Sequence, residues 1–323
     1  MNPLKVVAFL DGSAGHEKQT KGVLQAIEEL TPLHVEYIRI PAPCFRSVIS
    51  DWFKYLAVYG LKIKMSYNRM FPTAPLDLII GTGSHTHVPM LILKEQCGGR
   101  IITCMTPDSL LIKKIDLCFI PQHDNQRSSD NILFTVGPPN SIPYSEDKKK
   151  EKGLILVGGI NKKGFNWRTE EIILDISSIL QRDSSINWTI SSSLRTPTDM
   201  NKALDVLVAE YPDVVFYRPR DTPPGWIEEQ YADNYFVWVT SDSMSMIYEA
   251  LTAGCRVGIL PVQWKKKDSK YEKSVQYLLK NGMVISYEQW KNGETDPIVY
   301  GRLDEANRCA KEILLRWWPD RLR

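Results

Sequence analysis

One stretch of the chain, Val237 to Ala253, constrains the fold more than any other. It reads VWVTSDSMSMIYEALTA, an apolar run followed by a polar turn and a helical pattern. This order predicts a strand that passes directly into a helix opened by Asp242 or Ser243. The first turn of such a helix has unpaired N–H groups and the positive end of the helix dipole, so it can bind a phosphate. Taken alone, the stretch also fits an ordinary capped helix of an α/β sheet.

Similar strand-to-helix patterns occur on both sides of one polar segment, SIPYSEDKKKEK at 141–152, which we expect to be a linker. The expected strands of the first half are 5–10, 34–40, 77–83, 100–105, 116–120 and 132–136, with helices at 20–30 and 87–97. Those of the second half are 153–159, 187–193, 214–217, 236–239 and 257–261, with helices at 169–180, 199–210 and 269–281.

These two series predict an α/β protein with two Rossmann-like, doubly wound domains and an interdomain cleft. A chain of 323 residues is long enough for two cores. We place the N-terminal, acceptor-side domain at 1–142 and the C-terminal, nucleotide-binding domain at 153–301. The remaining segment, 302–323, contains a last helix, and the sequence leaves open whether this helix crosses back to the first domain.

Composition points to an ordinary soluble protein. The net charge is +2, which gives no argument for nucleic acid. None of the six cysteines forms a C-x-x-C pair, so we expect reduced thiols in a cytoplasmic protein. The chain starts directly with a strand, and no apolar run approaches the roughly 20 residues of a membrane span.

Ligands of doubly wound sheets bind beyond the carboxyl ends of the strands, so the loops there are the first candidates. In the first half these are DGSAGHEKQTKG, with Gly12 and Gly15, and IGTGSHT, with Gly83 and Ser84. Glycines in such turns allow a ligand to approach the backbone closely. Neither loop has the G-x-G-x-x-G pattern of a dinucleotide site.

Six motifs then occur in order: DGSAGHEKQTKG, IGTGSHT, TPDSLLIKKIDLCFIPQHD, LVGG, SSSLRTP and TSDSMSMIYEA. Together they resemble the mitochondrial fission family, which is named for elongated mitochondria in plants and is also widespread in bacteria. The resemblance covers roughly residues 6–261. It implies a glycosyltransferase of GT-B architecture, with the acceptor on the N-terminal domain and the nucleotide-sugar donor on the C-terminal one. SSSLRTP departs from the expected two basic residues, because Leu194 leaves Arg195 as the one guanidinium there.

The donor side has its own candidate residues. Gly158 and Gly159 end a predicted strand and can let a phosphate lie against the backbone, and Lys162 follows closely. Arg195 can contact a phosphate through two N–H groups. The alternatives are a solvated turn for Lys162 and a structural salt bridge for Arg195.

Further donor candidates follow the expected strands 236–239 and 214–217. Ser243 and Ser245 can bind phosphate at the helix start, and Glu249 can accept hydrogen bonds from a ribose. Arg218 follows another strand and can border the base. A salt bridge on the helix face is the alternative for Glu249.

The first domain is expected to supply a base for the acceptor hydroxyl, because all five histidines lie in this half. His16 and Glu17 are the first candidates, followed by Asp108 and by His123 with its neighbour Asp124. A hydrogen-bonded structural role is open for each of them. The chain has no D-x-D motif, so we expect no metal and no cofactor, and the charge of the leaving group would fall to Arg195 and the helix dipole.

Two aromatic and basic segments bear on membrane contact. Residues 52–71, WFKYLAVYGLKIKMSYNRMF, can form an amphipathic helix on an anionic membrane or a helix packed into the core. Near the C-terminus, Trp317, Trp318, Arg321 and Arg323 can add an interfacial anchor.

The sequence thus predicts a metal-independent glycosyltransferase that moves a sugar from a nucleotide donor to a cell-envelope glycan or lipid-linked acceptor. We expect it in the cytoplasm, at the inner face of the membrane. Two alternatives stay open: a nucleotide-sugar epimerase or hydrolase on the same fold, and a non-catalytic adaptor that recruits a partner to membranes.

Overall fold

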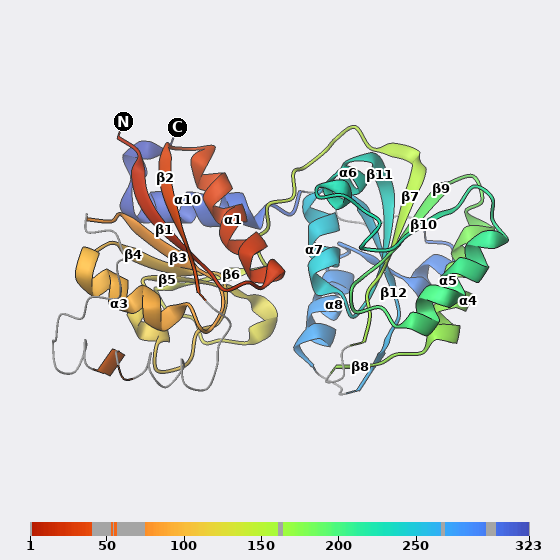
Figure 1. Cartoon of the computed structure of the whole chain (residues 1–323), viewed down its shortest axis with the longest axis horizontal. Coiled ribbons are helices and arrows are strands. Elements are labelled where there is room, and N and C mark those ends of the chain that lie inside the picture. Colours follow the sequence, from red (N-terminus) through yellow and green to blue (C-terminus); the bar gives the residue numbers. More distant parts are fainter. Residues whose placement is uncertain are drawn as a thin grey trace. The chain divides into compact units, whose positions relative to one another are not determined.

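The computed structural model describes residues 2–40, 53, 55–56, 75–160, 164–265, 269–294 and 302–322. The contacts of the chain divide it into two units, Met1–Ser141 with Asp304–Arg323 and Ile142–Leu303 (Figure 1). Each unit is an α/β domain built on its own six-stranded sheet.

The first unit has a parallel sheet in the order β2-β1-β3-β4-β5-β6. Its strands are β1 (Leu4–Leu10), β2 (Leu33–Arg39), β3 (Leu78–Gly81), β4 (Arg100–Thr103), β5 (Leu117–Pro121) and β6 (Ile132–Thr135). Its helices are α1 (Ala14–Glu28), α3 (His87–Cys97), α10 (Glu305–Trp317) and the short η1 (Ile112–Lys114), η2 (Gln122–Asp124) and η3 (Pro319–Arg321).

Both faces of the first sheet are covered, which is why its central strands are almost wholly apolar. One core cluster joins β1 and β3 to α1 and α10, through residues such as Ile27 and Ile313. A second cluster joins the opposite face to α3, through residues such as Met90 and Ile120. The last helix, which follows the second unit in sequence, therefore completes the core of the first unit.

The second unit has a parallel sheet in the order β10-β9-β7-β11-β12-β14 and a small antiparallel pair, β13-β8. The strands are β7 (Lys149–Val157), β8 (Phe165–Asn166), β9 (Asn187–Ser192), β10 (Val215–Tyr217), β11 (Asn234–Thr240), β12 (Arg256–Leu260), β13 (Gln263–Trp264) and β14 (Ile285–Ser286). The helices are α4 (Thr169–Arg182), α5 (Thr198–Ala209), α6 (Trp226–Asp233), α7 (Met244–Thr252), α8 (Lys270–Lys280) and α9 (Tyr287–Lys291).

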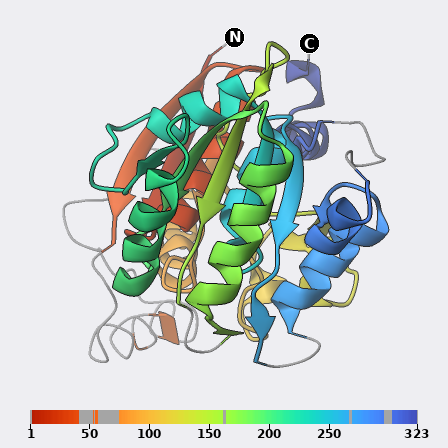
Figure 2. The same cartoon turned by 90° about the vertical axis from the view of Figure 1, so that its right-hand side faces the viewer.

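Helices α4 and α5, green in Figure 2, cover one face of this sheet and share a core cluster with its strands. Large rings of this cluster lie directly on the backbone of neighbouring strands. A Cβ at Gly153 would come within 2.3 Å of the Trp188 ring, and one at Gly258 within 2.5 Å of the Trp238 ring. On α7 and α8, Tyr248 Oη lies 2.6 Å from Ser274 Oγ, which joins these two helices.

Two boundaries differ from the sequence-based expectation. Helix α1 begins at Ala14 and not near Thr20, because Ser13 takes the N-cap position and its carbonyl accepts the Glu17 N–H at 2.9 Å. The expected linker at 141–152 ends in strand β7, whose lysines are neutralised there: Lys152 Nζ lies 2.7 Å from Asp233.

The expected membrane-contacting segments have different outcomes. Residues 52–71 lie outside the described residues except for 53, 55 and 56, so the amphipathic helix is not tested. Trp317 and Trp318 pack against the first core cluster, and Arg100 lies over the Trp317 ring at 5.5 Å, so these rings contribute to the fold. Within the described part of the chain, no helix is both long and apolar enough to cross a membrane.

Candidate functional site

The loops after three neighbouring strands of the second sheet meet at one point. Strand β7 lies between β9 and β11. The chain first adds β9 and β10 on one side of β7 and later adds β11 and β12 on its other side, so the strand order reverses at β7. Ligands of open α/β sheets bind at the carboxyl edge where the strand order reverses in this way. Gly158 and Gly159 follow β7, residues 193–196 follow β9, and Asp242 and Ser243 follow β11.

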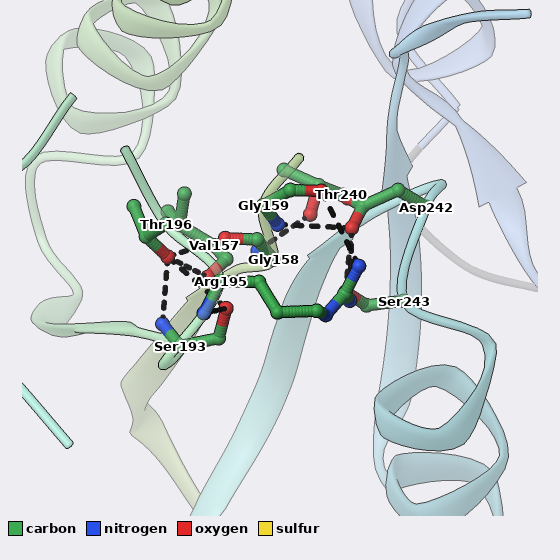
Figure 3. A network of polar contacts seen from close by, with 9 residues as sticks. All are labelled: Val157, Gly158, Gly159, Ser193, Arg195, Thr196, Thr240, Asp242 and Ser243. Carbon is green, nitrogen blue, oxygen red and sulfur yellow. Dashed lines mark hydrogen bonds and ion pairs between the residues drawn. The ribbon is translucent and has the colours of Figure 1, made fainter. Parts of the chain in front are cut away.

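A buried carboxylate, that of Asp242, connects the three loops (Figure 3). Its side chain is 0% exposed. Atom Oδ2 accepts the Gly159 N–H at 2.9 Å, the Arg195 Nη2 at 3.1 Å and the Ser243 hydroxyl at 3.1 Å. Atom Oδ1 is buried and has no hydrogen-bond partner among the described residues. We call these contacts, together with those of Thr196 and Thr240, the Asp242 network.

Two threonines complete the Asp242 network from the neighbouring strand ends. The Gly158 N–H donates to Thr240 Oγ1 at 2.8 Å. The Thr196 hydroxyl contacts the carbonyls of Val157, at 3.1 Å, and of Gly158, and it accepts the Ser193 N–H at 2.8 Å. The ends of β7, β9 and β11 are therefore held together partly by two threonines, Thr196 and Thr240, that sequence analysis did not select.

The two glycines after β7 are required by this close packing. A Cβ at Gly158 would lie 2.0 Å from Ser243 Oγ, and one at Gly159 would lie 2.2 Å from the carbonyl carbon and oxygen of Arg195. Both glycine amides already donate to side chains of the Asp242 network. Close packing is therefore enough to explain glycine at both positions, without the approach of a phosphate that the sequence suggested.

Free donors remain at the start of helix α7. The N–H groups of Met244, Ser245 and Met246 have no hydrogen-bond acceptor within the part of the chain that the structure describes. Ser245 is exposed on this first turn, whereas Ser243 is buried and bonded to Asp242 and Arg195. The Arg195 side chain is 45% exposed beside this turn and also donates to the Gly159 carbonyl at 3.3 Å. The first turn of α7 with Arg195 thus forms a cationic, donor-rich surface.

Two other candidates for donor binding, Glu249 and Arg218, are not among the contacts of the Asp242 network. Glu249 is 7% exposed and lies beside Tyr231, whose pKa is raised well above its usual value, first by burial and then by the Glu249 charge. This carboxylate is therefore a mostly buried group of the helix, and its contact with a ribose stays a prediction. Arg218 forms a surface ion pair with Asp205 of α5 and takes no part in the Asp242 network. Lys162 lies outside the described residues.

The first unit brings a histidine and a carboxylate together at the corresponding place in its own sheet. The strand order reverses between β1 and β3, and Asp11 follows β1. Its Oδ2 lies 2.7 Å from His16 Nδ1, and its Oδ1 accepts the Ser13 N–H at 3.0 Å. His16 is on the first turn of α1 with 36% of its side chain exposed, whereas that of Asp11 is 7% exposed. The carboxylate thus fixes the imidazole and leaves its other nitrogen available.

Gly83, from the loop after β3, packs directly on this pair. A Cβ there would lie 2.2 Å from Asp11 Oδ2 and 3.1 Å from His16 Nδ1, and the residue has a φ of +117°. This position therefore needs glycine for two reasons, and neither is the approach of a ligand. Of the other loop residues selected for acceptor contact, Gly12 and Ser84 are exposed, and Gly15 is the second residue of α1.

A second histidine, His87, lies behind this surface. It is 0% exposed, its Nε2 lies 3.0 Å from Thr103 Oγ1, and its pKa is lowered to about 4 by burial. The charges of Asp108, His85 and His16 also act on this pKa, so these groups gather at one edge of the sheet. His87 is uncharged at neutral pH and contributes to the packing beneath them.

Two of the remaining candidates for the base, Glu17 and His123, lie close to charged side chains. Glu17 lies 3.1 Å from Lys21 Nζ and 3.3 Å from Arg39 Nη1, which fits the structural role that was its alternative. Asp108 is exposed in the loop after β4. His123 lies 3.8 Å from Asp124, whose other oxygen accepts the Thr106 hydroxyl at 2.7 Å.

Sequence analysis did not select Asp11, and it considered Asp242 only as a possible start of helix α7 and not as a partner of Arg195. Asp11 directly follows a buried strand and Asp242 lies two residues beyond one, which is a detectable signal. Their partners are five residues away for Asp11 and 47 residues away for Asp242. In the described chain, no group of three or more His, Cys, Asp or Glu side chains could hold a metal ion.

Comparison with known protein families gives a match over most of the chain. The family model described as "Mitochondrial fission ELM1" matches residues 14–317. The chain belongs to the mitochondrial fission ELM1 family. No curated protein matches the sequence of this family member.

Solved structures show that this member of the ELM1 family has the GT-B fold. A UDP-N-acetylglucosamine 2-epimerase from Listeria monocytogenes matches with a TM-score of 0.61 and 11% identity over 98% of this chain and 97% of the other. The S. aureus MnaA–UDP structure matches with a TM-score of 0.55 and 12% identity over 99% and 98%. The glycotransferase of kitacinnamycin matches with a TM-score of 0.53 and 12% identity over 97% and 96%.

Proposed function

We propose that this protein is a metal-independent glycosyltransferase that moves a sugar from a nucleotide-sugar donor to a glycan or lipid-linked acceptor of the cell envelope. The observation that carries the proposal is the first turn of α7, where the N–H groups of residues 244–246 lie beside Arg195 at the strand-order reversal of the second sheet. Helix N-termini in this position are typical phosphate sites. The structurally similar MnaA is described with bound UDP, which supports a nucleotide ligand.

The donor phosphates would bind these N–H groups, the exposed Ser245 hydroxyl and the Arg195 guanidinium. Negative charge develops on the leaving nucleotide during transfer, and fixed donors that face this charge lower the barrier without reorganising. Asp242 would act as a positioning residue, because its carboxylate holds one side of the guanidinium through Nη2. The remaining N–H groups of Arg195 can then face a phosphate.

The base would be His16. With Nδ1–H donating to Asp11 Oδ2, the Nε2 atom of a neutral imidazole can accept the proton of an acceptor hydroxyl. The Asp11 carboxylate fixes this tautomer and stabilises the imidazolium that forms. The expected location at the inner face of the membrane stays a prediction.

A thermal-shift screen against UDP-, GDP-, CMP- and dTDP-sugars tests the donor site. A ligand at about 100 times its Kd stabilises a folded protein by about 2.7 kcal/mol, which is readily measured. We expect stabilisation of the wild type and of Lys280→Gln, which replaces an exposed lysine at the end of α8, and its loss in Arg195→Ala. If no nucleotide stabilises the wild type, the donor-site proposal is wrong and the adaptor alternative gains support.

The second candidate is a nucleotide-sugar epimerase, because proteins with that description share the fold and a fixed imidazole can also accept a proton from carbon. Incubation with the stabilising nucleotide sugar, with and without membrane glycolipid extracts, separates the two. A transferase consumes the donor in step with the extract, whereas an epimerase or hydrolase forms an epimer or free sugar without any acceptor.

A further inference from the structure

An open pocket of about 330 Å³ lies in the second unit next to the loop that follows β7. Its volume falls within the range of small-molecule sites. The lining residues are Ile160, Phe165, Asn166, Trp167, Arg168, Gln263 and Lys265. They come from two segments, one after β7 and one after β12, and none of them belongs to the Asp242 network.

The pocket is joined to that network by the backbone. Ile160 lines the pocket with its side chain 45% exposed, and its N–H donates to the Arg195 carbonyl at 3.1 Å. Gly159, the residue before it, is bonded to Asp242. A ligand whose phosphate contacts Arg195 could therefore extend over Ile160 into the pocket.

The pairing of β8 with β13 determines which side chains face the pocket. Asn166 is directly opposite Gln263, and Phe165 is directly opposite Trp264. Since side chains alternate along a strand, the two amides share one face, and Arg168 and Lys265 continue it two residues further along each chain segment. On the other face, Phe165 is buried, with its ring centroid 4.5 Å from that of Trp264.

The exposed face of this pair thus presents two amides and two cations. Asn166 Nδ2 and Gln263 Oε1 are 3.5 Å apart, so the hydrogen bond between them is weak. A ligand can therefore replace it with hydrogen bonds of its own. Arg168 Nη1 contacts Glu171 at 2.6 Å, but both side chains are more than half exposed, and such surface pairs are weak. The Trp167 side chain also lines the pocket, but its indole N–H is buried and therefore out of reach of a ligand.

We propose that this pocket binds a sugar that carries an anionic group. Amide side chains hydrogen-bond well to hydroxyl groups, because each amide has both donors and an acceptor. Arginine and lysine recognise a carboxylate or phosphate on the ring. If the proposed function is right, this sugar is the one carried by the nucleotide donor, and the pocket selects acidic or phosphorylated sugars over neutral ones.

Tryptophan fluorescence titrations with glucuronate, glucose 1-phosphate, glucose and inorganic phosphate test the pocket. We expect both anionic sugars to bind at least about fivefold more tightly than glucose, as one charge-assisted contact provides. Trp167→Phe should remove most of the signal. Arg168→Gln should reduce the preference for anionic sugars, and Gln263→Ala should weaken every sugar, whereas Lys280→Gln, at the end of α8, should change nothing.

Three results would overturn the proposal: equal affinity for glucose and glucuronate, an unchanged preference in Arg168→Gln, or inorganic phosphate binding as tightly as the anionic sugars. Circular dichroism of each variant excludes loss of the fold as the cause. The glucuronate arm and the glucose 1-phosphate arm tell a carboxylate from a phosphate as the recognised group.

The same variants separate this proposal from the proposed function. UDP binding should be lost in Arg195→Ala and kept in Arg168→Gln, because the pocket lies outside the Asp242 network. If UDP binds and no anionic sugar does, the pocket proposal fails and the donor site stands. If anionic sugars bind and no nucleotide does, the pocket binds sugars but the glycosyltransferase proposal fails.

Discussion

The substitution Gly159→Ala tests why glycine follows β7. The new Cβ would lie 2.2 Å from the carbonyl carbon and oxygen of Arg195 and 2.5 Å from the Thr196 nitrogen. These are backbone atoms that cannot rotate away, so the loop after β9 has to move by about 1 Å to reach an ordinary contact. Overpacking of this kind typically costs 1–3 kcal/mol, and we expect about 3 kcal/mol here.

The competing explanation is that glycine is present to let a phosphate approach the backbone. It predicts a change of opposite sign in the free energy of unfolding. If the site were open, alanine would reduce the entropy of the unfolded chain and raise the free energy of unfolding by up to about 1 kcal/mol, while nucleotide binding was lost. The two explanations therefore differ by several kcal/mol in a quantity that does not depend on any ligand.

Urea-induced unfolding, followed by tryptophan fluorescence, measures this difference. Six of the nine tryptophans lie in Ile142–Leu303, so the signal reports mainly on the second unit. Gly225→Ala is the matched control, because this glycine has a φ of +86° and no atom within 4 Å of its built Cβ. It should cost about 1–2 kcal/mol from backbone strain alone. A Gly159→Ala protein that is no less stable than this control would refute the reasoning.

Three further predictions concern the first unit. Burial lowers the pKa of His87 to about 4, so the unfolded chain binds this proton first and the wild type loses about 3 kcal/mol of stability between pH 6.5 and 4. His87→Phe should remove this loss in urea titrations at a series of pH values; an unchanged dependence on pH contradicts the reasoning. Gly83→Ala should destabilise the unit by about 2–3 kcal/mol and displace Asp11; wild-type stability in calorimetry would exclude the close packing. His16→Ala and Asp11→Asn should each lower turnover of the stabilising donor about 100-fold or more, without weakening nucleotide binding; equal loss of binding would argue against a base.

Local sequence patterns were sufficient for most strands and for the parallel α/β architecture. Apolar runs such as 236–239 and 153–157 can be buried on both faces only in a sheet covered by helices on each side, and the structure has these strands at β11 and β7. The start of α7 at Met244, after the Ser243 N-cap, also follows from the local order of residues. In the first unit, the apolar runs predicted the strands. The prediction of a loop at 11–19 was wrong, because one glycine, Gly15, does not prevent a helix from starting at Ala14.

The functional residues divide in the same way. His16, Arg195 and the α7 helix start were selected from residue type and position after a strand. Their partners, Asp11 and Asp242, were not, because an acidic residue after a strand has the same local pattern whether it faces solvent or a cation. The sequence also could not show that Glu17 and Arg218 are paired with charged residues of neighbouring elements.

The sequence by itself determined the repeated strand-to-helix units, the helix N-terminus that can receive an anion, and the membership in a family. The tertiary structure alone decided that Gly158 and Gly159 are packing residues, that Asp242 holds Arg195, and that α10 completes the first core. The physical reason is the range of the forces involved. Helix capping and burial patterns are encoded within a few residues, whereas a steric contact or an ion pair between loops depends on which strands become neighbours in the sheet.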